Sequence, residues 1–374
     1  MRRIARCIVL ASALALAACA APATREAADF RLVGYVVRDA EPARIAAEKL
    51  TALNFAFAEI DSNGAVVLQH VEDADYLARL HALKSRNPQL KILISVGGWG
   101  ADGFSDAALS DESRARFADS AAQLIARHQL DGIDIDWEYP GLADAGIRSR
   151  VEDKQDFTAL LLALRKRFDQ LADAQHRRNN PYLITAALAD REFVANIELA
   201  RVGAVLDWVN LMTYDFHGSL TKTTGHHSAL RRSATSAPDE RSVESAVAQF
   251  VAAGVPARKL VIGVPFYGKE FLDAQATNRG LDQPFTGRVP VYSWRQLVAD
   301  FIDRNGYARY WDDTAQVPYL WNAQTRAFVS YDDPQSLAIK ADFVKAHHLG
   351  GMMYWEQSQD ADGELLTALA RALR

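Results

Sequence analysis

Short apolar runs alternate along the chain with longer segments in which apolar residues recur every three or four positions. The short runs are rich in β-branched and aromatic residues, as buried strands are, and the longer segments have the period of amphipathic helices. Eight runs are expected to form strands: residues 32–37, 53–60, 92–96, 132–138, 182–188, 208–214, 260–265 and 351–355. This alternation predicts βαβ units and therefore a parallel sheet.

Helical periodicity is clearest in six segments: residues 73–85, 111–128, 153–171, 242–253, 334–347 and 364–373. Eight strands, each followed by a helix, close most economically into a (β/α)8 TIM barrel. We therefore expect an α/β fold of this type. Chemistry in such barrels lies at the C-terminal ends of the strands, so candidate residues are sought there.

The connection between the seventh and eighth predicted strands, residues 268–329, is too long for an ordinary loop. It contains a helical pattern and three short aromatic runs: residues 293–304, 307–311, 318–321 and 327–331. We expect a small α+β insertion domain at 269–328, with the barrel formed by 30–268 and 329–374. Its aromatic side chains are expected to divide between packing its core and walling a cleft.

The first residues have the pattern of an export signal. Arg2, Arg3 and Arg6 precede an apolar stretch, residues 7–18, that is too short to span a bilayer. The Leu-Ala-Ala-Cys sequence that ends at Cys19 resembles a bacterial lipobox. We expect a lipoprotein signal peptide at 1–18, lipidation of Cys19, a tether at 19–29 and attachment to a bacterial membrane, the outer one foremost. Ordinary cleavage near Cys19 would instead release a secreted or periplasmic protein.

Charge and composition exclude several classes of protein. Without the leader, the sequence has 39 Lys and Arg residues and 47 Asp and Glu residues, which gives a net charge of −8. This negative charge argues against a nucleic-acid partner. Cys7 and Cys19 are the two cysteines of the sequence, so the segment that follows them has no disulfide or thiolate metal site. We expect no metal and no other cofactor, membrane contact only through the lipid anchor, and a monomer.

The densest candidate chemistry lies in the fourth predicted strand. Asp134, Asp136 and Glu138 share one face because strand side chains alternate with a period of two, and apolar residues take the other face. These flanking residues argue for burial rather than for a solvated edge strand. Three carboxyl groups buried together repel one another, which raises at least one pKa and retains a proton at neutral pH. A protonated acid beside a carboxylate is what glycosidic bond cleavage requires.

The spacing Asp131-x-x-Asp134-x-Asp136-x-Glu138 resembles the signature of glycoside hydrolase family 18, the chitinase family. The insertion is similar in position and size to a domain found in one branch of that family. Three further motifs at predicted strand ends resemble family segments: Ser95-Val-Gly97-Gly98-Trp99, Met212-Thr-Tyr214-Asp215 and the run of residues 351–356 that contains Trp355.

This resemblance implies a retaining hydrolase that uses substrate-assisted catalysis. Glu138 would protonate the leaving oxygen and then act as the base toward water. Asp136 would orient the substrate N-acetyl group, whose carbonyl oxygen attacks the anomeric carbon to give an oxazolinium ion, and Asp134 would share a proton with Asp136. Tyr214 would donate its hydroxyl to the same carbonyl oxygen.

The resemblance also assigns residues to sugar binding. Asp215 would contact the acetamido sugar, and Trp355 would stack beneath its ring. Tyr35 and Phe57, near the ends of the first two predicted strands, are weaker candidates. The remaining candidates come from the motifs: Met212, Ser95, Gly97, Gly98 and Trp99.

Three functions fit these residues. The leading one is a chitinase that cleaves β-1,4 bonds between N-acetylglucosamine units of chitin or chitooligosaccharides. An endo-β-N-acetylglucosaminidase would catalyse the same reaction on N-glycans or cell-wall glycans. A chitin-binding lectin would bind the sugar chain without cleaving it. The intact Glu138 argues against a lectin. The insertion favours chitin, because in the resembling branch it walls one side of a deep cleft.

Lipidation of Cys19 is directly testable. Cells that express the wild-type chain and are fed radiolabelled palmitate should incorporate label into it, whereas the Cys19→Ala chain should remain unlabelled because it lacks the acceptor thiol. Equal labelling of both chains would remove Cys19 as the modified residue.

Overall fold

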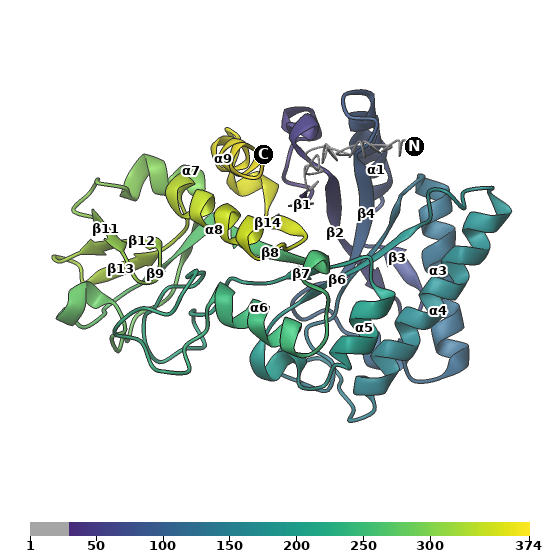
Figure 1. Ribbon diagram of the computed structural model, residues 1–374, viewed down its shortest axis with the longest axis horizontal. Helices are drawn as coiled ribbons and strands as arrows, with labels where there is room; N and C mark the ends of the chain where they lie inside the picture. Colours follow the sequence, from purple (N-terminus) through teal and green to yellow (C-terminus); the bar gives the residue numbers. More distant parts are fainter. Residues whose placement is uncertain (1–29) are drawn as a thin grey trace, which may run out of the picture.

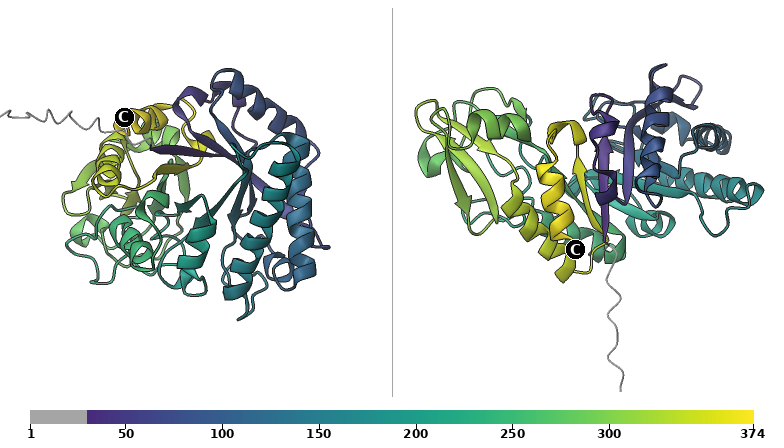
Figure 2. Two further views of the ribbon diagram at one scale, coloured as in Figure 1. Left: turned by 45° about the vertical axis from the view of Figure 1, so that its right-hand side comes forward. Right: turned by 90° about the horizontal axis from the view of Figure 1, so that it is seen from above.

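The computed structural model describes residues 30–374 as a barrel of parallel strands with a smaller sheet beside it (Figure 1). The barrel closes because β1 pairs with both β2 and β14. Figure 2 shows helices around the outside of these strands. The barrel strands are β1 (Arg31–Val36), β2 (Ala52–Ile60), β4 (Lys91–Gly97), β5 (Gly132–Asp136), β6 (Leu183–Leu188), β7 (Trp208–Leu211), β8 (Leu260–Pro265) and β14 (Gly351–Trp355). The predicted α/β barrel is thus confirmed.

Residues 104–107 and 199–205 form two short helices that were not predicted. The other six helices of the barrel follow the predicted segments closely. Three of them, α3, α6 and α8, begin at capping boxes in which a polar side chain accepts from the backbone of the first turn. The helices are α1 (Asp73–Ala82), α2 (Phe104–Ala107), α3 (Asp111–His128), α4 (Asp153–Ala174), α5 (Leu199–Val205), α6 (Val243–Ala252), α8 (Pro334–Ala346) and α9 (Glu364–Ala372). None of the helices in residues 30–374 is long and apolar enough to cross a bilayer.

The expectation that every strand is followed by an α-helix is wrong for β1. Two 3₁₀ turns, Pro42–Arg44 and Ala47–Lys49, connect β1 to β2. Recrossing a strand of about 20 Å takes about 13 helical residues. Only residues 37–51 lie between the two strands, which leaves almost nothing for the loops.

Two predicted strands end earlier than the apolar pattern suggests. β5 ends at Asp136 rather than at residue 138, and β7 ends at Leu211 rather than at residue 214. The pairing of β5 with β6 stops at Ile135, and its pairing with β4 stops at Asp136, so the chain beyond has no neighbouring strand. Glu138 therefore lies on a loop at the C-terminal end of the barrel, which we call the barrel mouth.

The long connection after β8 forms a separate antiparallel sheet in the order β10-β9-β13-β12-β11. It uses residues on both sides of 269–328, since β9 begins at Tyr267 and β13 ends at Ser330. Its own core contains Phe271, Tyr319 and Trp321, so these rings are not available to a cleft. The elements are β9 (Tyr267–Phe271), β10 (Val291–Ser293), α7 (Trp294–Gln296), a π-helical turn (Leu297–Phe301), β11 (Ala308–Asp312), β12 (Val317–Asn322) and β13 (Ala327–Ser330). A further short strand, β3 (Val66–Leu68), pairs antiparallel with β2.

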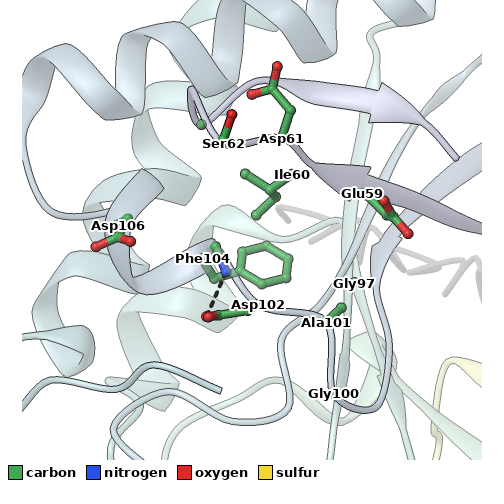
Figure 3. A pocket seen from close by; sticks show the side chains of 12 residues that line it. Glu59, Ile60, Asp61, Ser62, Gly97, Gly100, Ala101, Asp102, Phe104 and Asp106 are labelled. Atoms are coloured by element: carbon green, nitrogen blue, oxygen red, sulfur yellow. Dashed lines mark hydrogen bonds between the residues drawn. The ribbon is translucent and has the colours of Figure 1, made fainter. Parts of the chain in front are cut away.

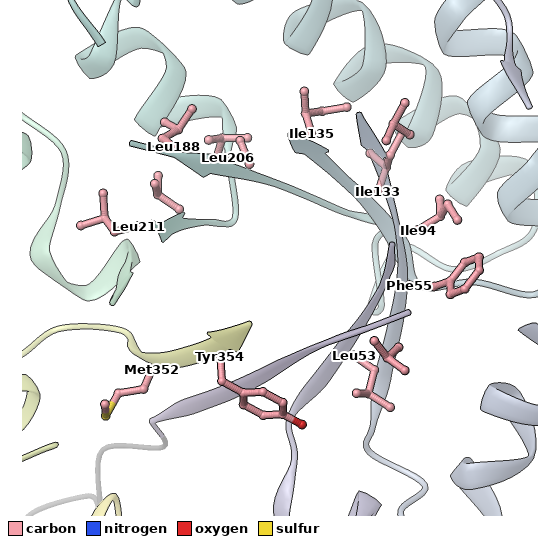
Figure 4. Close-up of a cluster of buried hydrophobic side chains, with 14 of the residues drawn as sticks. Leu53, Phe55, Ile94, Ile133, Ile135, Leu188, Leu206, Leu211, Met352 and Tyr354 are labelled. Atoms are coloured by element: carbon pink, nitrogen blue, oxygen red, sulfur yellow. The ribbon is translucent and has the colours of Figure 1, made fainter. Parts of the chain in front are cut away.

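The main core lies between the barrel and its helices. Figure 4 shows Ile133 and Ile135 of β5 on this outer side, with Ile94 of the neighbouring strand. The alternation predicted for β5 is therefore observed, and Asp134 points into the barrel. The interior there is filled by a smaller apolar cluster: Val33, Tyr35, Ala52, Ala56, Leu93, Trp208, Tyr214, Val261 and Met353.

A buried ion pair joins α8 to the turn before it, and its lysine also donates to the loop after β7. The Lys340 ammonium lies 2.6 Å from a carboxylate oxygen of Asp332 and 2.8 Å from the Ser228 hydroxyl. Both charged side chains are wholly buried. Removal of one partner from such a pair leaves the other charge buried without compensation.

Lys340→Met should therefore lower the free energy of unfolding by about 3–5 kcal/mol. Adding Asp332→Asn should recover part of the loss, because the stranded charge is then removed. Urea denaturation of both variants measures this, with Lys345→Met on the same helix as the control. A loss no larger than that of the control would contradict the assignment.

Candidate active site

Asp134 is the polar centre of the barrel interior and is wholly buried. Its carboxylate accepts hydrogen bonds from four neighbouring strands. The donors are the Tyr35 hydroxyl at 2.8 Å, the Ser95 hydroxyl at 2.8 Å, the Thr185 hydroxyl at 2.5 Å and the Asn210 amide at 3.1 Å. Burial raises the pKa of Asp134, and the four hydrogen bonds oppose the rise.

This arrangement corrects two sequence assignments. Tyr35 and Ser95 were expected to bind sugar, yet both are buried, with exposed fractions of 1% and 0%. Their hydroxyls face Asp134, so they position a carboxylate rather than touch a substrate. Thr185 and Asn210 do the same and were missed, because single polar residues in strands carry no recognisable spacing.

Asp136 lies one step closer to the mouth and is 4% exposed. One of its carboxyl oxygens, Oδ1, has no hydrogen-bond partner among residues 30–374. Burial raises its pKa well above the usual range, and the charges of Glu138 and Asp134 raise it further. The raised pKa of Asp136 favours retention of a proton in this row of carboxyl groups, and its Oδ1 is buried without a partner.

Glu138 follows β5 on the loop over the mouth and is partly exposed. Burial raises the pKa of Glu138 to about 7, the charge of Asp215 adds to the rise, and hydrogen bonding to Tyr139 partly offsets it. The carboxyl group thus titrates close to neutral pH. It can act both as an acid and as a base.

Asp215, on the loop after β7, joins the barrel to the second sheet. Its Oδ1 accepts from the Tyr267 hydroxyl and from the Lys269 ammonium, both at 2.7 Å. Nδ1 of the buried His227 lies 3.5 Å from the same oxygen. Desolvation by itself would raise the pKa of Asp215, but His227 and Lys269 outweigh it and hold the pKa well below its usual range. These three partners were missed by sequence reasoning.

Aromatic rings form the floor beside the carboxyl row. Trp355 is partly exposed and stacks on Phe57 with ring centroids 5.6 Å apart and an interplanar angle of 23°. Tyr214 is nearly buried, and burial raises its pKa well above the usual range, so its hydroxyl remains a donor. Met212 packs against the barrel-interior cluster. Trp99 is 58% exposed, at the end of β4, where a ring face is accessible to a sugar.

Gly97 and Gly98 were expected to contact sugar, but the structure gives them a backbone role. Their φ angles are 116° and 95°, a region that favours glycine. The Gly98 amide donates to the Asp136 carbonyl at 2.9 Å, and a Cβ on Gly97 would lie 2.1 Å from the same oxygen. The two glycines let β4 approach β5 closely and fix the backbone of Asp136.

Behind this turn lies a hollow of about 440 Å³ that several carboxylates line (Figure 3). The loop around it already engages these groups. Asp102 accepts from the backbone amides of Gly103 and Arg148, and Asp106 pairs with the side chains of Arg148 and Arg150. The hollow therefore belongs to the scaffold of the loop after β4. Residues 30–374 contain no cluster of three or more His, Cys, Asp or Glu side chains suited to a metal ion.

Known proteins share this architecture and this set of residues. The model of Glycosyl hydrolases family 18 matches residues 31–360. This chain belongs to that family. Chitinase A1 of Niallia circulans is 36% identical over 93% of the chain, and the chain spans 59% of that protein's length.

Two solved structures with the family 18 fold superpose well on this chain. The N-acetylglucosaminidase of Paenibacillus barengoltzii superposes with a TM-score of 0.86 at 39% identity, over 92% of this chain and 100% of that one. Human YKL-39, a pseudo-chitinase with retained chitooligosaccharide binding, gives a TM-score of 0.80 at 26% identity, over 92% and 99% of the two chains. The same fold thus includes both an enzyme and a protein that only binds.

The charge of Asp215 should contribute to the alkaline limit of the predicted hydrolase activity, because it adds to the raised pKa of Glu138. In the mechanism that the sequence predicts, the acid form of Glu138 donates the proton, so kcat/KM should fall above about pH 7, where that form is lost. Asp215→Asn removes a negative charge that raises this pKa, so the alkaline limb should move to lower pH. The measurement is the pH dependence of kcat/KM on soluble N-acetylglucosamine oligomers, with Asp342→Asn on α8 as the control. An alkaline limb that stays in place in Asp215→Asn would contradict this coupling.

Proposed function

We propose that this protein is a retaining chitinase that hydrolyses β-1,4-N-acetylglucosamine linkages in chitin or chitooligosaccharides. The observation that carries the proposal is the row of Asp134, Asp136 and Glu138, which rises from the barrel interior to a partly exposed acid with a pKa of about 7. Similarity to Chitinase A1 over most of the chain supports the substrate class.

The first step breaks the glycosidic bond. Glu138 donates its proton to the leaving oxygen while the substrate's own acetamido oxygen bonds to the anomeric carbon, which gives an oxazolinium ion. The Asp136 carboxyl group accepts from the acetamido N–H, which orients that group and stabilises its positive charge. The Tyr214 hydroxyl donates to the acetamido oxygen.

The second step consumes water. Glu138, now ionised, removes a proton from a water molecule as its oxygen attacks the anomeric carbon from the face that the leaving group vacated. The acetamido group is released, Glu138 is protonated again, and the product keeps the β configuration. In this proposal Asp134 shares a proton with Asp136, and Trp355 supports the sugar ring from below.

The second sheet favours a substrate of several linked sugars over a single sugar unit. Its strand β9 supplies Tyr267 and Lys269 to the site through Asp215. The sheet therefore borders the mouth on one side, and exposed Trp99 lies at the end of β4 on the barrel itself. An endo-β-N-acetylglucosaminidase would use the same chemistry on N-glycans or cell-wall glycans.

We also propose that the enzyme is exported as a monomer and anchored through a lipid on Cys19. The basic start, the apolar stretch of residues 7–18 and the cysteine that follows support this proposal. These residues lie outside the part of the chain that the structure describes.

Replacement of Glu138 separates catalysis from binding. Glu138→Gln should abolish hydrolysis of N-acetylglucosamine oligomers and leave their binding nearly unchanged, because the amide has the same shape and cannot donate the proton. Chromatography of the products before mutarotation should show β anomers from the wild type. Glu244→Gln on the surface of α6 is the matched control.

Hydrolysis that persists in Glu138→Gln, or α anomers from the wild type, would contradict the mechanism. Oligomer binding without cleavage by the wild type would instead identify a lectin.

A further inference from the structure

The end of the barrel opposite the mouth carries a surplus of basic residues. We define this basal face as the first residues of the barrel strands and the loops that lead into them: residues 30–31, 47–52, 83–91, 129–132, 175–183, 206–208, 253–260 and 347–351. It contains nine Lys and Arg residues against three Asp and Glu residues. The whole chain has a net charge of −5, so this surplus is local.

All three carboxylates of the basal face are already engaged. Glu48 pairs with Arg86 at 2.8 Å and Asp131 with Lys84 at 2.6 Å. Asp207 is held by Arg165, a residue of α4, at 2.6 Å. Asp207 also acts through its charge on Arg31 and Lys259, so Lys49, Lys91 and Arg258 are the least compensated cations of the face.

Five cations of the face have no carboxylate within 4 Å among residues 30–374: Arg31, Lys49, Lys91, Arg258 and Lys259. Four of them donate to neutral groups. Arg31 donates to a backbone carbonyl, Lys49 to the Thr367 hydroxyl, Lys91 to the Asn180 side chain at 3.1 Å and Lys259 to three backbone carbonyls, whereas Arg258 is exposed. Unpaired positive charge at this end has no part in the proposed chemistry, because the carboxyl row lies at the other end of the strands. A partner with negative charge would complement it.

The basal face also contains the point where the chain enters the barrel. A cavity of about 400 Å³ opens there, and its lining combines three of the unpaired cations with the first described residue: Phe30, Arg31, Asp207, Arg258, Lys259, His348, Leu349 and Gly350. Twenty-nine residues precede Phe30 in the sequence. The leader therefore joins the folded barrel at this end.

We propose that the basal face docks on an anionic phospholipid surface. Phosphate oxygens of the headgroups accept from the unpaired Lys and Arg side chains, and one headgroup fits the cavity beside Phe30. A membrane satisfies both observations, since it presents many phosphates in one plane and lies where the chain enters. The barrel mouth then opens away from the bilayer, toward a polysaccharide chain in solution.

This docking is independent of the proposed chitinase activity and of acylation. It rests on charges of the folded barrel, each of which contributes about fivefold to partitioning onto an anionic surface. An acyl chain on Cys19 would add to it without replacing it.

Flotation with lipid vesicles tests the proposal on the full chain carrying Cys19→Ala, which cannot be acylated. Vesicles of phosphatidylcholine alone measure any insertion of apolar residues 7–18, and vesicles with phosphatidylglycerol add negative charge. Binding should be at least tenfold greater with phosphatidylglycerol and should disappear as NaCl is raised, because salt screens exposed charges. Lys91→Glu with Arg258→Glu should reduce this binding at least tenfold.

The matched control is Arg295→Glu with Arg304→Glu, which makes the same change of charge on exposed residues of the second sheet domain. It should keep most of the vesicle binding, and both double variants should hydrolyse soluble oligomers like the parent chain, which confirms that they fold. Equal binding to both kinds of vesicle, or equal losses in the two double variants, would overturn the proposal. The proposal would also be overturned if the protein bound an anionic polysaccharide and did not bind vesicles, because its partner would then be a polysaccharide.

Discussion

A carboxyl group at the centre of a closed barrel must find its hydrogen bonds inside the barrel, and Asp134 imposes this requirement on the strands around it. A buried carboxylate without partners is strongly destabilising. Four strands supply the hydrogen-bond donors, which are Tyr35, Ser95, Thr185 and Asn210. Each donor occupies an interior position that an apolar side chain would otherwise fill. The interior therefore combines this polar cluster with apolar residues of the same strands, and further carboxyl groups follow along β5 toward the mouth.

The environment of the carboxyl groups changes step by step along that strand. Asp134 has every hydrogen bond it needs, Asp136 has an oxygen without a partner, and Glu138 reaches solvent. Each step makes the group more available to a substrate and less constrained by the protein. Because these groups interact, they titrate together, and the proton rests wherever the bound ligand favours it.

The sequence predicted the features that depend on local periodicity. The alternation along β5, the order of strands and helices and the separate sheet after β8 all follow from patterns within a few residues of one another. The partners of Asp134 and Asp215 could not be predicted in this way, because Thr185, Asn210 and Lys269 come from distant segments and meet only when the barrel closes. The strand ends were overestimated for a related reason. Where pairing stops depends on the neighbouring strands, and no single run of residues records it.

Lys269 belongs to β9, and hence to the smaller sheet, although its charge acts on a residue of the barrel. The smaller sheet is thus more than an appendage that a related scaffold could exchange freely. Grafting a sheet from another protein in its place would remove the ammonium that keeps Asp215 ionised, unless the donor strand carried a cation at the same register. Engineers who recombine such parts would have to treat the join between β8 and β9 as part of the catalytic apparatus.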